Sequence, residues 1–583
     1  MRGRTKLLDL YRALPPAVQR PLVQVFSPTQ RVKIVSFLGR PGFLSGIRSK
    51  LLSEHLTRQY SGILRNNNFR TVSDHEQRIL ARTRNHANPT EVRKNNQDTV
   101  TDILAQAGVP YFFVNGTSPL RTVLGIPDTY RDMVLRELHT ALRHEGAYVR
   151  EAATHAVPTP LNDRRRLRKL SGAAALQVYL PVSDPRGWLV LGRSFSCEIE
   201  FWSPSAAEDG ELIAPRRNRV TPTIQDAAAT VKFNESAFTR LISSDDTTEV
   251  PTAPEFAVSH IDDVNFPVDA VYTWVDGSDP DWLEKKRQAL TELGSAEDLN
   301  ELAANNSRYL DRSELRYSLR SLYHYAPWIR HIFLVTDQQV PHWLTTEHPD
   351  ITIVSHQELF GDTGKLPTFN SHAIESRLHR IPGLAEHFLY LNDDVFLGRP
   401  LTPEHFFHSN GVAKFFLSKA QVEPGPPTVE DPPVLAAGKN NRDLVSRARS
   451  LTLTQKMKHV PHAQRLSVLQ ELEQRFPDEF EATARHQFRH PGDISIPSSL
   501  QHYWSYVTGR AVPDSIRYIY SDLSDPATPT RLTKLLHQRN FDTFCLNDHD
   551  SAEQSLASQQ DMLTEFLDRY FPMASPYELD ISG

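Results

Sequence analysis

Acidic residues follow two separate apolar segments of this chain. Residues 268–274 (VDAVYTW) lead into Asp276, and residues 388–392 (FLYLN) lead into Asp393 and Asp394. Each apolar segment is typical of a buried β-strand that ends in a turn. In open α/β sheets the carboxyl ends of the strands face the ligand crevice. The two acidic strand ends therefore predict a metal-assisted site for a phosphorylated ligand.

Asp393 and Asp394 are the candidate metal ligands at this site. Mg²⁺ and Mn²⁺ prefer carboxylate oxygens and leave coordination positions for phosphate oxygens. We therefore expect Mg²⁺ or Mn²⁺ as the cofactor. The alternative for two adjacent Asp residues is an acidic turn that caps the next element.

Arg312 and Arg316 are one helical turn apart in the amphipathic segment 312–325. A shared face would make them a clamp for a diphosphate, because Arg offers bidentate donors. The alternative is a solvated helix face with local ion pairs to Asp311 and Glu314.

Two further motifs indicate little by themselves. His459 and His462 do not match the HExxH metal motif, and no third ligand follows nearby. Residues 361–365 (GDTGK) lack the spacing of a phosphate-binding P-loop, which argues against an ATPase.

Strand and helix patterns alternate around these residues. Strand patterns cover residues 268–274, 331–337, 351–356 and 388–392, and helix patterns cover residues 312–325 and 371–379. This alternation predicts an α/β fold with a mostly parallel, Rossmann-like sheet covered on both faces.

The 583 residues are enough for two or three domains. We expect a basic, mostly helical region over residues 1–95, an accessory α/β region over residues 96–253, and a main domain over residues 254–583. Within the main domain, residues 421–440 read as a Pro/Gly-rich loop and residues 441–490 as a helical insertion.

The first 70 residues carry 13 Lys and Arg against 2 Asp and Glu, whereas the whole chain has a net charge of -5. A basic arm on an acidic body favours an anionic partner, either a membrane surface or a polyanion. The alternative is the positive face of a small helical subdomain. No secretory signal or membrane-spanning segment is evident, and two distant Cys residues provide no disulfide framework. We expect a cytoplasmic protein that touches the inner face of the membrane.

Four long sequence blocks resemble the Stealth family of sugar-phosphate transferases. They are residues 268–282 (VDAVYTWVDGSDPDW), residues 308–396, residues 459–490 with HVPH and RFPDEFEATARHQFRH, and residues 544–578 with FCLND and FLDRYFPMASPYE. The blocks occur in the family's order and lie within roughly the C-terminal half of the chain. Such an ordered set is far more specific than a short motif.

The resemblance implies a reaction. Members of the family transfer a sugar 1-phosphate from a UDP-sugar to a hydroxyl of a glycan or lipid-linked sugar and release UMP, in capsule or exopolysaccharide synthesis. Such phosphoryl transfer needs charge neutralisation on the diphosphate, a base for the hydroxyl and in-line positioning. N-acetylhexosamine 1-phosphate is the expected transferred group.

The resemblance also implies roles for individual residues. His459 matches the family's catalytic histidine, and Arg489 matches an arginine that neutralises phosphate charge. Asp548 matches an acidic residue that binds metal, orients His459 or acts as the base. Trp274 and Asp276 are expected to line the donor, although Trp274 also fits a core position.

Asn370 is the last residue expected at the donor, and it also fits the cap of the helix that follows.

Two other functional classes compete with sugar-phosphate transfer. A conventional metal-dependent glycosyltransferase would share the acidic strand ends but break the bond at the sugar carbon and release UDP. A non-catalytic binding module would not need the retained polar residues. A nucleic-acid-binding role is disfavoured, because the basic arm has few aromatic residues and no known reader fold.

Overall fold

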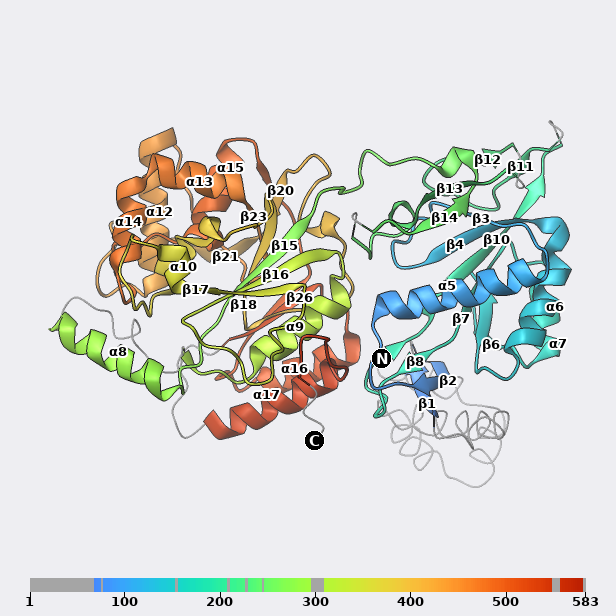
Figure 1. Ribbon diagram of the computed structural model, residues 1–583, viewed down its shortest axis with the longest axis horizontal. Helices are drawn as coiled ribbons and strands as arrows, with labels where there is room; N and C mark the ends of the chain where they lie inside the picture. Colours follow the sequence, from blue (N-terminus) through green and yellow to red (C-terminus); the bar gives the residue numbers. More distant parts are fainter. Residues whose placement is uncertain are drawn as a thin grey trace, which may run out of the picture.

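The computed structural model has two lobes that lie side by side (Figure 1). The structure describes residues 68–74, 77–152, 156–206, 210–225, 229–243, 246–294, 309–547 and 556–579. The N-terminal lobe ends with Phe256 in its core, and the core of the C-terminal lobe begins at Val264. The chain therefore passes from one core to the other over residues 257–263, and the expected boundary at residue 254 stays a prediction.

The N-terminal lobe is a mixed α/β structure. One sheet has the strand order β1-β2-β8-β9, and the larger sheet runs β13-β14-β3-β4-β10-β7-β5-β6, with β11 and β12 at its side. The strands are β1 (Phe69–Asp74), β2 (Gln77–Thr83), β3 (Phe112–Phe113), β4 (Thr122–Pro127), β5 (Tyr148–Glu151), β6 (Thr159–Pro160), β7 (Ala175–Tyr179), β8 (Val182–Ser183), β9 (Val190–Leu191), β10 (Cys197–Pro204), β11 (Leu212–Ile213), β12 (Thr223–Ile224), β13 (Val231–Asn234) and β14 (Glu249–Thr252); the helices are α5 (Pro89–Gln106), α6 (Arg131–Leu142) and α7 (Arg164–Leu167).

The expectation of a mostly helical region up to residue 95 is wrong for its described part. The strands β1 and β2 pair in antiparallel register as a hairpin, and α5 begins only at Pro89. Thr71, Val72, Ile79 and Leu80 supply the β-branched and apolar residues that favour a strand. Residues 1–67 lie outside the described residues.

The C-terminal lobe is built on a five-stranded sheet with the order β17-β16-β15-β18-β23. Its strands are β15 (Val268–Thr273), β16 (Ile329–Thr336), β17 (Ile351–Ser355), β18 (His387–Asn392), β19 (Val395–Leu397), β20 (Ala413–Phe415), β21 (Leu417–Gln421), β22 (Gln455–Met457), β23 (His462–Arg465), β24 (Ala511–Pro513), β25 (Tyr518–Asp522) and β26 (Thr543–Asn547); its helices are α8 (Pro280–Leu293), α9 (Glu314–Tyr325), α10 (His356–Phe360), α11 (Ser371–Glu375), α12 (Pro433–Arg449), α13 (Leu466–Arg475), α14 (Pro477–Arg485), α15 (Gln501–Val507), α16 (Thr528–Gln538) and α17 (Leu556–Tyr570).

The parallel α/β arrangement expected from the sequence is confirmed. β15 pairs in parallel with β16 and β18, β16 pairs in parallel with β17, and only β23 runs antiparallel, against β18. Thr273 pairs with Asn392, so the chain leaves β15 and β18 at the same edge of the sheet. This register brings the two acidic segments of the sequence to one place.

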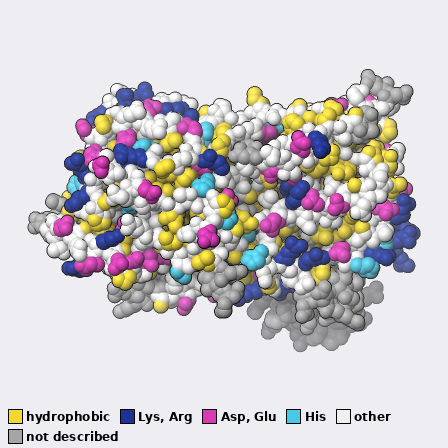
Figure 2. Space-filling model, viewed as in Figure 1, with side chains coloured by type: hydrophobic (Ala, Val, Ile, Leu, Met, Phe, Trp, Pro, Cys, Tyr) yellow, Lys and Arg dark blue, Asp and Glu magenta, His cyan; other side chains and the backbone are white. Residues whose placement is uncertain are grey.

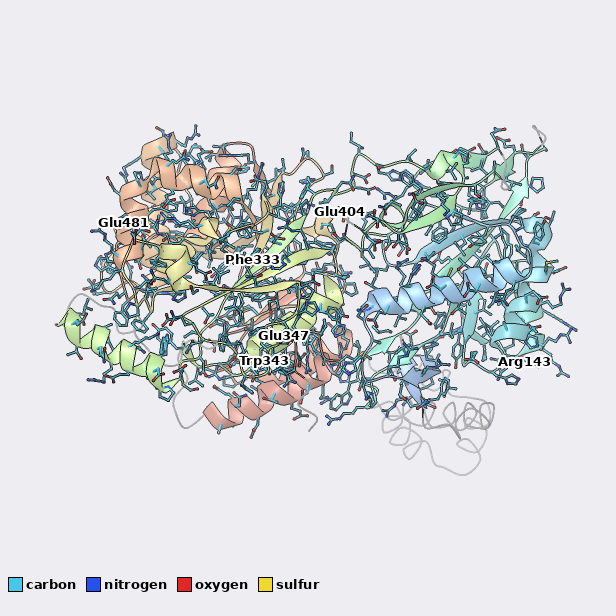
Figure 3. All side chains as sticks on the ribbon, viewed as in Figure 1. Arg143, Phe333, Trp343, Glu347, Glu404 and Glu481 are labelled. Atoms are coloured by element: carbon cyan, nitrogen blue, oxygen red, sulfur yellow. The ribbon has the colours of Figure 1, made fainter. Side chains whose placement is uncertain are left out.

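Both faces of this sheet are buried, because successive side chains of a strand point to opposite faces. Tyr272 and Leu334 belong to one core, with α9 and α17, whereas Val271 and Phe333 belong to the other, under the helices of residues 433–507. Figure 3 labels Phe333 within β16. The near-continuous apolar strands are typical of a parallel sheet covered on both faces.

The helical layer over the second face differs in its boundaries from the expectation. α12 begins at Pro433, inside the segment 421–440 that reads as a loop, and the short strands β22 and β23 interrupt the expected helical insertion. Proline at the first turn of a helix is well tolerated, because its missing N–H has no partner there in any case.

Charged side chains of both signs are interspersed over both lobes on the face shown in Figure 2. Nucleic-acid-binding proteins instead tend to gather Lys and Arg on one face.

Replacing Leu389 in β18 should destabilise the C-terminal lobe strongly. Leu389 is fully buried in the central part of the sheet. Leu389→Ala should lower the free energy of unfolding by about 2–5 kcal/mol through lost burial and a residual cavity. Urea unfolding followed by intrinsic fluorescence measures the change. Leu451→Ala, at an exposed position, is the control and should change stability by less than about 0.5 kcal/mol; equal effects of the two substitutions would contradict this packing.

Candidate active site

The carboxylate of Asp394 is the meeting point of three distant chain segments. Its Oδ1 lies 3.1 Å from Nε2 of His459, and its Oδ2 accepts hydrogen bonds from Nδ2 of Asn547 at 2.8 Å and Sγ of Cys545 at 3.3 Å. Asp394 lies in the turn between β18 and β19, whereas His459 lies between β22 and β23. Cys545 and Asn547 belong to β26, which pairs with β19. The sheet pairings therefore assemble this cluster.

The pKa of His459 is raised above its usual value. Burial disfavours the imidazolium, but the carboxylates of Asp394, Glu375 and Asp393 more than offset this cost. In return, His459 holds the pKa of the Asp394 carboxyl below its usual range, although burial acts in the opposite direction. About a third of the His459 side chain remains exposed (32 %), so its ring is accessible to a substrate.

Asp393 carries the opposite shift. Burial raises its pKa to about 8, and the neighbouring carboxylates of Asp394 and Asp311 add to the rise. Burial also raises the pKa of Glu314 well above its usual value, with Asp393 and Asp311 contributing, and it raises the pKa of Asp311, with Asp276 contributing. Five acidic groups thus repel one another at the ends of β15 and β18.

This donor set fits a divalent cation. Arg312 offsets only part of the repulsion that raises the pKa values of Asp393, Asp311 and Glu314, and a hard cation with oxygen ligands would offset more of it. Both oxygens of Asp394 accept hydrogen bonds from side chains, whereas the hydrogen bonds to Asp393 come from backbone N–H groups. Cys545 lies near enough to form a metal-binding group with Asp394 and His459. Its thiol suits a hard cation poorly, since burial raises its pKa well above the usual value and keeps it protonated.

Asp548 lies outside the described residues. The neighbouring Asn547, which contacts Asp394, is the last residue described before it. Its predicted role stays a prediction.

Arg489 and Glu375 form a second part of the site. Nη2 of Arg489 donates to Oγ of Ser371 at 2.6 Å, and within the described residues its buried Nη1 has no hydrogen-bond partner. Burial raises the pKa of Glu375, although His372, Arg489 and His459 lower it. Oε1 of Glu375 accepts a hydrogen bond from the Tyr390 hydroxyl, whereas its buried Oε2 has no partner in the described part of the chain.

Glu375 is a functional candidate that the sequence reasoning missed. It lies in α11, between segments that were expected to matter, and nothing in its local pattern distinguishes it from a solvent-facing helix residue. The structure instead buries it (5 % exposed) within the electrostatic reach of His459 and Arg489. The only sequence signal available is its place inside the block 308–396.

Asn370 caps α11, as the sequence allowed. Its Oδ1 accepts from the backbone of His372, and its Nδ2 donates to the carbonyl groups of His486 and Phe488 and to Asp493. These contacts fasten the segment that carries Arg489. Since the side chain is fully buried and all its polar groups are occupied, Asn370 positions the site, and a direct contact with the donor stays a prediction.

Trp274 and Asp276 follow β15 at the sheet edge. Trp274 is 6 % exposed and belongs to the core of the lobe, which agrees with its alternative interpretation. Oδ1 of Asp276 accepts hydrogen bonds from Ser278, and its backbone is held by Gln339. Asp276 therefore shapes the turn beside the acidic cluster.

The prediction that Arg312 and Arg316 share one face of a helix is wrong. α9 begins at Glu314, after Ser313 with a positive φ of 65°, so Arg312 precedes the helix. Arg312 is buried beside Glu314, with 4.0 Å between Nη1 and Oε1. Arg316 instead donates to Glu578 near the C-terminus at 2.5 Å. The structure keeps Arg312 at the acidic cluster and engages Arg316 elsewhere.

Asp394→Asn should lower the pKa of His459. Without the carboxylate, burial acts against the imidazolium with weaker opposition. The midpoint pH for carbethoxylation of His459, followed by mass spectrometry, should therefore move downward. Asp443→Asn, at an exposed position (65 %), should leave it unchanged. An unchanged midpoint in Asp394→Asn would show that the carboxylate does not control this histidine.

Comparison with known proteins places these residues in matched regions. The models of Stealth protein conserved regions 1, 2, 3 and 4 match residues 266–294, 308–415, 458–506 and 533–582. Every predicted site residue lies inside one of them.

Curated relatives match almost the whole chain. The protein named exopolysaccharide phosphotransferase SCO6023, from Streptomyces coelicolor, is 42% identical and covers 97% of this chain and 96% of its own length. The protein named exopolysaccharide phosphotransferase CpsY, from Mycobacterium leprae, is 34% identical over 86% of this chain and 89% of its own length. Among solved structures, the galactosyltransferase LgtC, in complex with donor and acceptor sugar analogues, matches with a TM-score of 0.28 and 10% identity over 52% of this chain and 95% of that chain. The four matched regions and the identity along the full chain show that this protein belongs to the Stealth family.

Proposed function

We propose that this protein transfers a sugar 1-phosphate from a UDP-sugar to a hydroxyl of a glycan or lipid-linked acceptor and releases UMP, in exopolysaccharide or capsule synthesis. The observation that carries the proposal is the contact of His459 with Asp394 beside the acidic cluster of Asp393. A base and a cation-binding cluster side by side are what phosphoryl transfer requires. The names of the relatives support the same class of reaction.

His459 is the proposed general base. When Nε2 carries a proton, it donates to Asp394, and the other ring nitrogen keeps its lone pair. That nitrogen then takes the proton of the acceptor hydroxyl as the oxygen attacks the β-phosphorus. The neighbouring carboxylates stabilise the imidazolium that forms, which is consistent with the raised pKa of His459.

Arg489 is proposed to neutralise charge on the phosphoryl group. Its buried Nη1, which has no acceptor among the described residues, is a donor that a phosphate oxygen would satisfy. Glu375 lies within electrostatic reach of both Arg489 and His459. Ser371 fixes the other end of the guanidinium through Nη2.

Asp393, with Asp311 beside it, is proposed to hold Mg²⁺ or Mn²⁺, and Asp548 is a further candidate. A bound cation would neutralise the diphosphate of the donor. Three residues border the same cluster and are proposed to line the donor: Trp274, Asp276 and Arg312. With the nucleotide bound, they would exclude bulk water from the site.

Contact of the basic residues 1–70 with an anionic membrane surface stays a prediction. Among the residues that the structure describes, no helix is both long enough and apolar enough to cross a membrane. A peripheral contact would keep the enzyme close to lipid-linked acceptors.

The nucleotide product tests the proposal. With UDP-N-acetylglucosamine, Mg²⁺ and a panel of glycan acceptors, the full chain should release UMP only when an acceptor is present. His459→Ala should lower the rate by about 10²–10⁴-fold, because the general base is lost. His537→Ala, at an exposed position outside the site, should retain the wild-type rate. Release of UDP would instead identify a conventional glycosyltransferase.

Asp393→Asn should weaken the binding of the cation. The concentration of Mg²⁺ for half-maximal rate should rise by about 10–100-fold, because one carboxylate ligand is replaced by an amide. The rate as a function of Mg²⁺ concentration measures the shift. Asp443→Asn is the matched control, and an unchanged Mg²⁺ requirement in Asp393→Asn would exclude this residue as a ligand.

A further inference from the structure

A second polar cluster lies next to the segment that carries Arg489. His486, His490 and Asp493 place one potential ligand atom each within 4.8 Å of the others. Nδ1 of His486 lies 2.7 Å from Oδ1 of Asp493, and the rings of His486 and His490 are 4.0 Å apart. The function proposed above leaves these three side chains unused.

His372, from α11, adds a fourth side chain from a different part of the chain. Its Nδ1 points to Asp493 at 3.5 Å from Oδ2, and its side chain is only 5 % exposed. In the described part of the chain this buried nitrogen has no hydrogen-bond partner. Its neighbour of opposite charge is the Asp493 carboxylate, at a distance near the outer limit of a hydrogen bond.

The carboxylate of Asp493 is fully buried. Nδ1 of His486 lies 2.7 Å from its Oδ1, and the backbone N–H of His490 donates to its Oδ2 at 2.9 Å. Nδ2 of Asn370 also donates to Oδ2 at 2.8 Å. A buried carboxylate with three imidazoles nearby therefore lies at the junction of two segments.

We propose that His372, His486, His490 and Asp493 bind one Zn²⁺ ion. Imidazole nitrogens and a carboxylate oxygen are the ligands that Zn²⁺ takes in tetrahedral protein sites, and the spacing His486-x₃-His490 is typical of them. The ion would replace the proton shared by His486 and Asp493, and Nδ1 of His372, now 3.5 Å from Asp493, would turn to it as a further ligand.

This ion differs in chemistry from the cation proposed at Asp393. Mg²⁺ prefers oxygen ligands, whereas a site with three imidazoles favours Zn²⁺. Its place in the fold gives it a structural role, because it would tie α11 to the loop after α14. Arg489 lies between His486 and His490 and would be held by both. Neither the binding nor its test depends on the reaction proposed above.

Metal analysis of the full chain tests the proposal. After treatment with a chelator, titration with Zn²⁺ and gel filtration, the wild type should retain about one Zn²⁺ per chain. Co²⁺ in its place should give the visible absorption of a tetrahedral site with nitrogen and oxygen ligands. Zn²⁺ should also raise the melting temperature of the wild type.

Matched variants complete the test. His490→Asn should lose the retained Zn²⁺ and the rise in melting temperature, while its far-ultraviolet circular dichroism stays that of the wild type. Asp393→Asn and His537→Asn should retain the ion. A wild type that retains no Zn²⁺, or a His490→Asn variant that binds it as the wild type does, would overturn the proposal and leave a hydrogen-bonded network around Asp493. If His490→Asn does not fold, the wild-type titration and its melting temperature decide alone.

Discussion

The hydrogen bond between Asp394 and His459 is the contact on which the rest of the site depends. The two residues are 65 positions apart and meet because β18 pairs with β15 on one side and with β23 on the other. The same carboxylate is held from β26 through Asn547. Three of the four matched family regions therefore converge on one side chain, and the sheet has to form before the site exists.

The adjacent residues Asp393 and Asp394 have pKa shifts in opposite directions, which indicates different environments for the two carboxylates. The pKa of Asp394 is lowered because His459 stabilises its charge, whereas that of Asp393 rises to about 8 because burial and neighbouring carboxylates oppose ionisation. A carboxylate with this environment gains most from a cation. We therefore propose that the neighbouring pair supplies both an orienting partner for the base and a ligand for a metal.

The sequence was informative where the alternation of strand and helix patterns coincided with acidic residues at the strand ends. The alternating strands and the acidic strand ends predicted a parallel sheet with a site at its carboxyl edge, because a buried strand must be apolar on both faces. His459 and Arg489 entered through the family resemblance. Their local patterns carry no such signal.

The structure differs where tertiary contacts outweigh local pattern. A helical period joined Arg312 to Arg316, but the positive φ of Ser313 starts the helix after Arg312, and Glu578 engages Arg316 from the far end of the chain. Glu375 could not be singled out because its importance comes from burial beside residues distant in sequence. The hairpin β1–β2 was missed because the prediction for residues 1–95 rested on their basic composition and not on the β-branched residues within them.

The position of bond cleavage tests the central claim most directly. A UDP-sugar labelled with ¹⁸O in the oxygen that joins the sugar carbon to the β-phosphorus distinguishes the two reactions. Transfer of a sugar 1-phosphate keeps the sugar–oxygen bond, so the label should appear in the glycan product, bound to phosphorus. Recovery of the label in released UDP would show attack at the sugar carbon and contradict the account.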